Sequence, residues 1–144
     1  MIWVIDASVA VKWFLADESN DEADFILERV VEDPRLFAVP ELFCFEVYAV
    51  LERLHPEPLK VFRKAVLPVL EGGILRYPVT ESLAKRANRF VKKGLTGYDA
   101  CYAALAQELK GLWLTFDRKA HEKIADMRVS HLVSAGRPKE WNYH

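Results

Sequence analysis

The chain alternates short apolar runs with longer helical patterns, and this alternation is the feature that most constrains its fold. Four runs rich in β-branched and aromatic residues are typical of strands buried on both faces, namely 2–5, 36–39, 75–79 and 112–115. A fifth run, at 128–133, fits an edge strand. Because strands that alternate with helices form right-handed crossovers, they pair in parallel under helices on both faces. We predict a three-layer α/β/α sandwich with a central, mostly parallel sheet of four or five strands.

Apolar residues at helical spacing fill the segments between these runs. The expected helices cover residues 8–15, 19–32, 40–54, 58–70, 80–93, 97–109 and 118–125. Ser8 is a candidate N-cap for the first helix, and Pro40 suits the opening of the third. The chain has 144 residues, and its breaks at 56–58 and 72–73 are too short to be linkers. We therefore expect a single domain over residues 1–144.

The net charge of −1 argues by itself against a nucleic-acid partner, but the charges are unevenly distributed. Residues 1–58 have 13 acidic and 4 basic side chains, whereas residues 59–144 have 8 acidic and 16 basic ones. Such asymmetry indicates a charged site or a polyanionic partner.

Features of membrane and secreted proteins are missing from the sequence. No apolar run approaches the roughly 20 residues that a membrane span requires, and the first residues lack the basic region of a signal peptide. We expect a cytoplasmic protein without a membrane partner. Cys44 and Cys101 stand among apolar and aromatic residues, which favours buried free thiols over a disulfide or a metal pair.

Two aspartates stand where predicted strands end. Asp6 directly follows the first strand, and Asp117 follows the strand at 112–115 by two residues. Ligands of open parallel sheets bind beyond the carboxyl ends of the strands, so both side chains belong to the expected site edge. Each aspartate can equally be a helix N-cap.

Two further acids lie on inward helix faces. Glu46 has Leu42, Phe43, Ala49 and Val50 as neighbours three and four positions away, so its carboxylate needs a partner, either an ion or a buried salt bridge. Asp99 is similar, although an aspartate in a first helical turn is favoured by the helix dipole alone.

Clustered carboxylates repel each other and require protons, lysines or a hard cation. Oxygen ligands without nearby histidine or cysteine suit Mg²⁺ or Mn²⁺. Such an ion at a sheet edge is suited to phosphodiester hydrolysis.

Four motifs in order carry a resemblance that runs over nearly the whole chain. They are VIDASVAVKWFL, PELFCFEVYAVL, TGYDACYAALA and LWLTFDRKA. With these motifs the chain resembles PIN-domain ribonucleases of the VapC toxin type. The resemblance implies an acidic quartet of Asp6, Glu46, Asp99 and Asp117, with Asp6 and Asp99 as direct metal ligands and the other two acting directly or through water.

The resemblance further implies an endoribonuclease that needs Mg²⁺ or Mn²⁺, a homodimer, and an antitoxin protein as partner. Ser8 and Thr115 would steady the site from outside the ligand set. Many members have asparagine three residues after the glutamate, where this chain has Ala49, and the change removes a polar contact near the pocket. The alternative is a non-catalytic RNA-binding or protein-interaction module in which the acids are caps and salt-bridge partners.

RNA also needs a positive surface. Candidate contacts are Arg89, Lys92 and Lys93 on one predicted helix and Arg118 and Lys119 beside Asp117, although a solvated helix surface is the ordinary explanation for such runs. Lys12 can reach the rim of the pocket or simply be exposed. Trp141 and Tyr143 in the tail either fold back onto the core or contact a partner.

Overall fold

Five parallel strands form one central sheet in the computed structural model, which describes residues 1–143 and side chains as far as Trp141. The strands are β1 (Trp3–Ile5), β2 (Phe37–Pro40), β3 (Leu75–Tyr77), β4 (Leu112–Thr115) and β5 (Ser130–Leu132). Their order across the sheet is β3-β2-β1-β4-β5, and every adjacent pair is parallel. The predicted fold class is therefore confirmed, with five strands.

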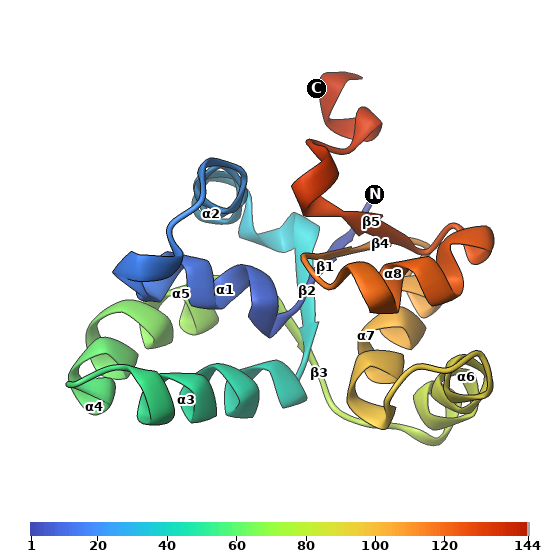
Figure 1. Ribbon diagram of the computed structural model, residues 1–144, viewed down its shortest axis with the longest axis horizontal. Coiled ribbons are helices and arrows are strands. Elements are labelled where there is room, and N and C mark those ends of the chain that lie inside the picture. Colours follow the sequence, from blue (N-terminus) through green and yellow to red (C-terminus); the bar gives the residue numbers. More distant parts are fainter. Residues whose placement is uncertain (144) are drawn as a thin grey trace.

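Helices cover both faces of this sheet (Figure 1). One side has α1 (Ala7–Phe14), α2 (Asp21–Glu32), α3 (Leu42–Leu54), α4 (Pro58–Val61) and α5 (Leu67–Glu71). The other side has α6 (Glu81–Lys92), α7 (Gly97–Glu108) and α8 (Arg118–Ile124). The chain winds outward from β1 in one direction and from β4 in the other. The carboxyl ends of β1 and β4 therefore form the switch point at which open α/β sheets bind ligands.

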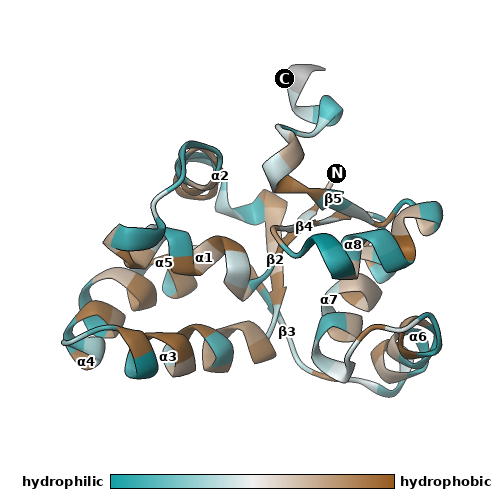
Figure 2. Ribbon diagram, in the orientation of Figure 1, coloured by the Kyte–Doolittle hydropathy of each residue, from teal (hydrophilic) through white to brown (hydrophobic). Residues whose placement is uncertain are grey.

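The core consists of the sheet and the helix faces turned toward it, where apolar residues gather (Figure 2). Its largest fully buried side chains include Trp3, Phe37, Phe43, Tyr102 and Trp113. Three strands are buried along nearly their whole length, which explains why β1, β2 and β4 read as continuous apolar runs.

Three local predictions were wrong. Asp6, and not Ser8, caps α1, because its carboxylate accepts the N–H of Val9. Pro40 ends β2, and α3 begins only at Leu42. The helix expected over 58–70 is divided into α4, a π-helical stretch at Phe62–Val66, and α5. Pro68 has no N–H to donate to a carbonyl of the preceding turn, which favours this change of helix type.

The tail folds back onto the core. The Trp141 ring lies edge-on to Trp3 at 5.0 Å between centroids and 5.4 Å from Phe25. Arg137 lies over the Phe25 ring and donates a 3.1 Å hydrogen bond to Glu22. The side chain of Tyr143 lies outside the described part of the chain.

Two other expectations concern cysteines and membranes. Cys44 and Cys101 are free thiols, as expected, but both are half-buried rather than fully buried. Over the described residues, no helix is both long and apolar enough to cross a membrane.

Candidate active site

Asp6 lies at the bottom of the switch point, directly after β1, and is only 5% exposed. Its Oδ1 accepts hydrogen bonds from the Ser8 hydroxyl at 2.5 Å and from the N–H of Val9 at 3.3 Å. Its Oδ2 accepts the indole N–H of Trp113 at 3.0 Å. Burial raises the pKa of Asp6 to about 6, although these hydrogen bonds act in the opposite direction.

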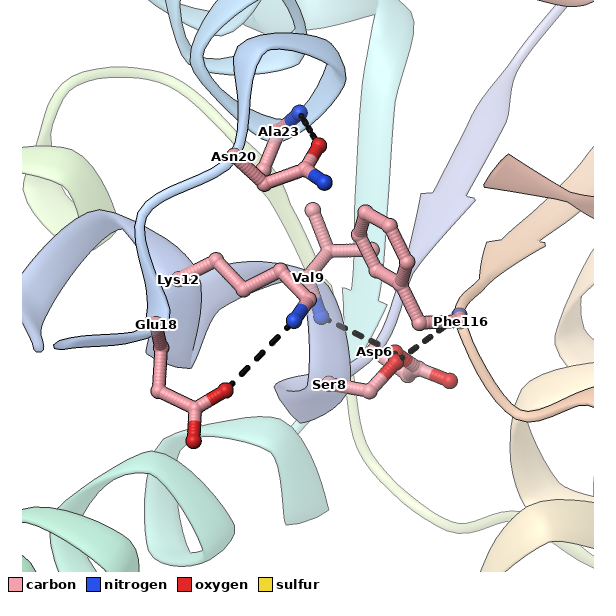
Figure 3. A network of polar contacts seen from close by, with 8 residues as sticks. All are labelled: Asp6, Ser8, Val9, Lys12, Glu18, Asn20, Ala23 and Phe116. Atoms are coloured by element: carbon pink, nitrogen blue, oxygen red, sulfur yellow. Dashed lines mark hydrogen bonds and ion pairs between the residues drawn. The ribbon is translucent and has the colours of Figure 1, made fainter. Parts of the chain in front are cut away.

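Ser8 and Thr115 join the ends of β1 and β4. The Ser8 hydroxyl oxygen accepts the N–H of Phe116 at 3.1 Å while the hydroxyl lies against Asp6 (Figure 3). The Thr115 hydroxyl oxygen accepts the N–H of Asp117 at 3.1 Å and lies 3.5 Å from the Ser8 hydroxyl. The backbone that leads to Asp117 is thus held next to Asp6 by two hydroxyl groups.

Glu46 faces the same strand ends from α3. The Tyr102 hydroxyl donates a 2.5 Å hydrogen bond to its Oε1. The carboxylate is half-buried, and its pKa is raised first by desolvation and further by the charge of Asp99, against the lowering effect of the Tyr102 bond. Glu46 and Asp99 are therefore within electrostatic reach of each other.

Asp99 occupies the first turn of α7, where the Thr96 hydroxyl accepts its N–H and caps the helix. Burial and the charge of Asp117 raise the pKa of Asp99, while Lys123 lowers it. Asp117 is exposed and caps α8 by accepting the N–H of Ala120 at 3.0 Å. Asp117 therefore caps a helix and also lies close enough to Asp99 to raise its pKa.

Sequence reasoning missed three residues near these acids. Tyr102 and Trp113 hold Glu46 and Asp6 by hydrogen bonds, and their rings stack on one another. Tyr102 follows Asp99 by three residues, so the helical period was a signal for its position beside the site. Trp113 looked like any buried strand residue. Lys123 lies near enough to Asp99 to lower its pKa.

Comparison with known proteins assigns the family. A sequence model of the PIN domain matches residues 3–126, which is most of the chain. The chain belongs to the PIN domain family. The predicted resemblance is thereby confirmed. No curated protein sequence matches the chain significantly.

Solved structures share this PIN fold over most of their length. A toxin–antitoxin complex from Klebsiella pneumoniae is 17% identical, with 89% of this chain and 94% of that chain covered and a TM-score of 0.65. VapBC2 from Rickettsia felis, bound to a promoter DNA fragment, is 12% identical, with 91% of this chain and 98% of that chain covered and a TM-score of 0.66. Mycobacterium tuberculosis VapC20, a sarcin–ricin loop cleaving toxin, is 14% identical, with 83% of this chain and 93% of that chain covered and a TM-score of 0.58. At these identities the likeness shows the fold.

The four acids of this PIN domain are chemically suited to bind a hard divalent cation. All four acids offer oxygen ligands to such an ion. Burial is the main cause of the raised pKa values of Glu46 and Asp99, and the charges of Asp99 and Asp117, respectively, raise them further. A cation would offset these like charges. Among the described residues, no three acidic, histidine or cysteine side chains form a ready-made coordination group. Asp6 and Asp99 are the candidate ligands, and these roles stay predictions.

The basic residues of the PIN domain occupy two places. Arg118 and Lys119 are exposed at the start of α8, next to Asp117. Arg89 and Lys92 are exposed on α6, which packs beside α7 (Figure 1). Lys93, at the end of α6, pairs with Asp126 at 2.9 Å.

Lys12 makes contacts at the rim, whereas Ala49 is simply exposed. The ammonium of Lys12 lies 3.5 Å from a Glu18 carboxylate oxygen and 4.7 Å from the centre of the Phe116 ring, so Lys12 is at the rim and paired (Figure 3). Ala49, where many members have asparagine, is exposed one turn beyond Glu46.

Proposed function

We propose that this PIN domain is an endoribonuclease that hydrolyses RNA phosphodiester bonds with Mg²⁺ or Mn²⁺. The observation that carries the proposal is the placement of four acids, from four separate elements, around the carboxyl ends of β1 and β4. Membership of the PIN domain family supports a nuclease. The position of the acids supports it as well, because open parallel sheets bind their ligands at this edge.

The proposed roles follow from burial and position. Asp6 and Asp99 hold the ion, and Glu46 and Asp117 balance its charge and orient the attacking water. A divalent ion bound here would polarise the phosphoryl oxygen and lower the pKa of water. The buried Asp6 forms the floor of the site, whereas the exposed Asp117 lies at the rim beside Arg118 and Lys119, which can contact phosphates. Hydrolysis of this kind leaves 3′-hydroxyl and 5′-phosphate ends.

We also propose that the chain is the toxin of a toxin–antitoxin pair. Two of the similar structures, the Klebsiella pneumoniae complex and VapBC2, are toxin–antitoxin assemblies, which supports a cognate antitoxin here. An antitoxin that places a basic side chain among the four acids would neutralise their charge and block the site. A homodimer and a cytoplasmic location belong to the same proposal.

One observation favours a non-catalytic module instead. Asp6 and Asp117 both cap helices, and no coordination group is preformed among the described residues. A purely structural role for the acids predicts that divalent ions leave the thermal stability unchanged, whereas an ion that binds only the folded state raises the unfolding midpoint with its concentration.

The decisive experiment incubates purified protein with a mixed RNA pool and Mg²⁺ or Mn²⁺, with Asp6→Asn and Asp99→Asn in parallel, and maps cut positions and end groups. We expect cuts by the wild type alone, with 5′-phosphate ends. Cleavage at the wild-type rate by either variant would overturn the assigned roles. A wild type that binds RNA without cutting it, with or without ions, would favour the non-catalytic module.

A further inference from the structure

Two buried aromatic side chains connect the Asp6 and Glu46 carboxylates through the interior of the protein. Tyr102 donates to Glu46 at 2.5 Å, and Trp113 donates to Asp6 at 3.0 Å. The two rings are stacked, with 6.0 Å between centroids and 12° between planes. Both are fully buried, at 1% and 0% exposure. A continuous path of contacts therefore runs from one carboxylate to the other.

Filling the core does not require this chemistry. Two apolar rings of similar size would pack between α7 and β4 as well, and they would leave no N–H or O–H to satisfy. A buried indole N–H or phenol O–H needs a hydrogen-bond partner. Here each aromatic residue finds its partner in one of the four acids, and both partners lie at the switch point.

The hydrogen bonds also fix the orientation of the Asp6 carboxylate. Oδ1 accepts hydrogen bonds from Ser8 and Val9, and Oδ2 accepts one from Trp113. The Thr115 hydroxyl lies close enough to lower the pKa of Asp6 as well. The indole is the one donor that holds Oδ2 from the neighbouring strand, and it therefore fixes the direction of that oxygen.

Glu46 is held in the same way. Its Oε1 accepts the Tyr102 hydroxyl, and among the described residues no hydrogen bond reaches Oε2. Tyr102 thus ties the glutamate of α3 to α7, the helix that also carries Asp99.

We propose that Tyr102 and Trp113 are positioning residues of the acidic site. Their stacked rings set the separation of the Asp6 and Glu46 carboxylates, and their two donors fix the orientation in which each carboxylate can meet an ion. This inference rests on the proposed nuclease function and extends it from the acids to the residues that orient them. Neither aromatic side chain touches RNA in this arrangement.

The test uses the full chain with one conservative change at a time. Tyr102→Phe removes one oxygen and keeps the ring, and Trp113→Phe removes the N–H and keeps a buried ring. Tyr48→Phe is the matched control for the first, because Tyr48 is exposed on α3. Trp3→Phe is the control for the second, because Trp3 is equally buried but packs against Trp141 at the start of β1.

Two sets of quantities are measured for each protein: kcat and KM for RNA, and the Mn²⁺ concentration that raises the unfolding midpoint by a fixed number of degrees. Residues that orient metal ligands change ion affinity or activity by about 10- to 100-fold when substituted. We expect about a tenfold lower kcat with KM within about twofold, and about a tenfold higher Mn²⁺ concentration in both test variants. Both controls should match the wild type in both quantities. Because the rings are stacked, the double variant should lose less than the product of the single losses.

Folded Tyr102→Phe and Trp113→Phe proteins with wild-type kcat and Mn²⁺ dependence would overturn the positioning role. Losses no larger than those of Trp3→Phe would overturn it as well, because they would reflect core packing alone. A wild type that binds Mn²⁺ but cuts no RNA would overturn the nuclease proposal, and weaker Mn²⁺ binding by the two variants would still support positioning. No effect of Mn²⁺ on the wild type would overturn both.

Discussion

The carboxylate of Asp6 and the indole N–H of Trp113 are joined by a 3.0 Å hydrogen bond across 107 residues of sequence. Asp6 directly follows the central strand β1, and Trp113 lies in the adjacent strand β4, whose register pairs it with Val4. The parallel pairing of these two strands therefore brings a buried donor to a buried carboxylate. This contact places the charge of the candidate site inside the core, where its protonation and its ion binding affect the stability of the fold.

Asp6→Asn should abolish RNA cleavage while the protein stays folded. The amide oxygen can accept the Trp113 N–H while the amide NH2 donates to the Ser8 hydroxyl, so only the cap on the Val9 N–H loses its acceptor. The negative charge that would bind the ion is lost, and we expect at least about a 100-fold lower kcat. Single-turnover cleavage with Mg²⁺, alongside circular dichroism, checks both statements. A variant that unfolds would contradict this account of the contacts.

The pH dependence of stability should reveal the raised pKa of Asp6. Its folded pKa of about 6 lies above the ordinary value of 3.8, so between these values the folded protein binds the proton and the unfolded protein does not. Without divalent ions, the contribution of Asp6 to the free energy of unfolding is therefore highest below about pH 4 and falls as the pH rises through 6. The Asp6→Asn variant does not lose stability in this way, because its amide does not titrate.

The measurement is the free energy of unfolding of wild type and Asp6→Asn by urea in EDTA at pH 5 and pH 8. Other titrating groups are common to both proteins and largely cancel in the difference. At about 1.4 kcal/mol for each pKa unit, the stability of the variant relative to the wild type should rise by about 1.4 kcal/mol from pH 5 to pH 8, because one unit separates pH 5 from the folded pKa of about 6. A difference that stays constant with pH would show that Asp6 does not titrate in this range.

Ser8→Ala should weaken both stability and cleavage. The change removes the 2.5 Å bond to Asp6 and leaves the N–H of Phe116 without its 3.1 Å acceptor. We expect a loss of about 1–2 kcal/mol in the free energy of unfolding and a lower kcat, because the ends of β1 and β4 are less firmly joined. Ser82→Ala is the control, since its 2.8 Å bond to Glu108 lies on the exposed surface. Equal effects of the two changes would argue against a special role for Ser8.

Charge removal on α6 tests the proposed RNA surface. Arg89→Ala with Lys92→Ala should weaken RNA binding and reduce the slope of affinity against salt concentration, by about one to two released ions if both side chains contact phosphates. Arg63→Ala with Lys64→Ala removes the same charge from an exposed segment on the other side of the sheet. Fluorescence anisotropy over a salt series in EDTA measures binding without cleavage. Identical slopes for the two double variants would remove α6 from the RNA surface.

Trp141→Ala should lower stability without changing the chemistry. Trp141 packs on Trp3 and Phe25, and Trp3 lies at the end of β1 opposite to Asp6. We expect a loss of about 2–3 kcal/mol, somewhat below the cost of truncating a fully buried aromatic residue. Urea unfolding checks this, with exposed Leu59→Ala as the control. A fall in kcat at a temperature where the variant is fully folded would mean that the tail also acts on the site.

Much of the fold could be predicted because its three central strands, β1, β2 and β4, are short, apolar and buried along nearly their whole length. The runs that became β1 and β4 have no amphipathic alternative, and the acids that follow them interrupt the apolar pattern. The sequence failed where two local rules competed. Pro40 is acceptable both at the end of a strand and at the start of a helix, and only its pairing with Tyr77 across β2 and β3 assigns it to the strand.

The acids themselves stand out in the sequence, because charge in an apolar run or at a strand end is a local signal. Their environment is not local. Trp113 does not differ in the sequence from an ordinary core aromatic, and the spacing of Tyr102 from Asp99 indicates only a shared helix face. Only the packing of α7 on β4 turns their polar ends toward Glu46 and Asp6.

The sequence by itself determined the strand and helix order, and with it a parallel sheet whose switch point carries acidic residues. The periods of apolar residues and the direction of crossovers are sufficient for that. Only the tertiary structure decided which donors hold the carboxylates of Asp6 and Glu46. Hydrogen bonds between residues 56 and 107 positions apart depend on how helices and strands pack, and no local pattern encodes that geometry.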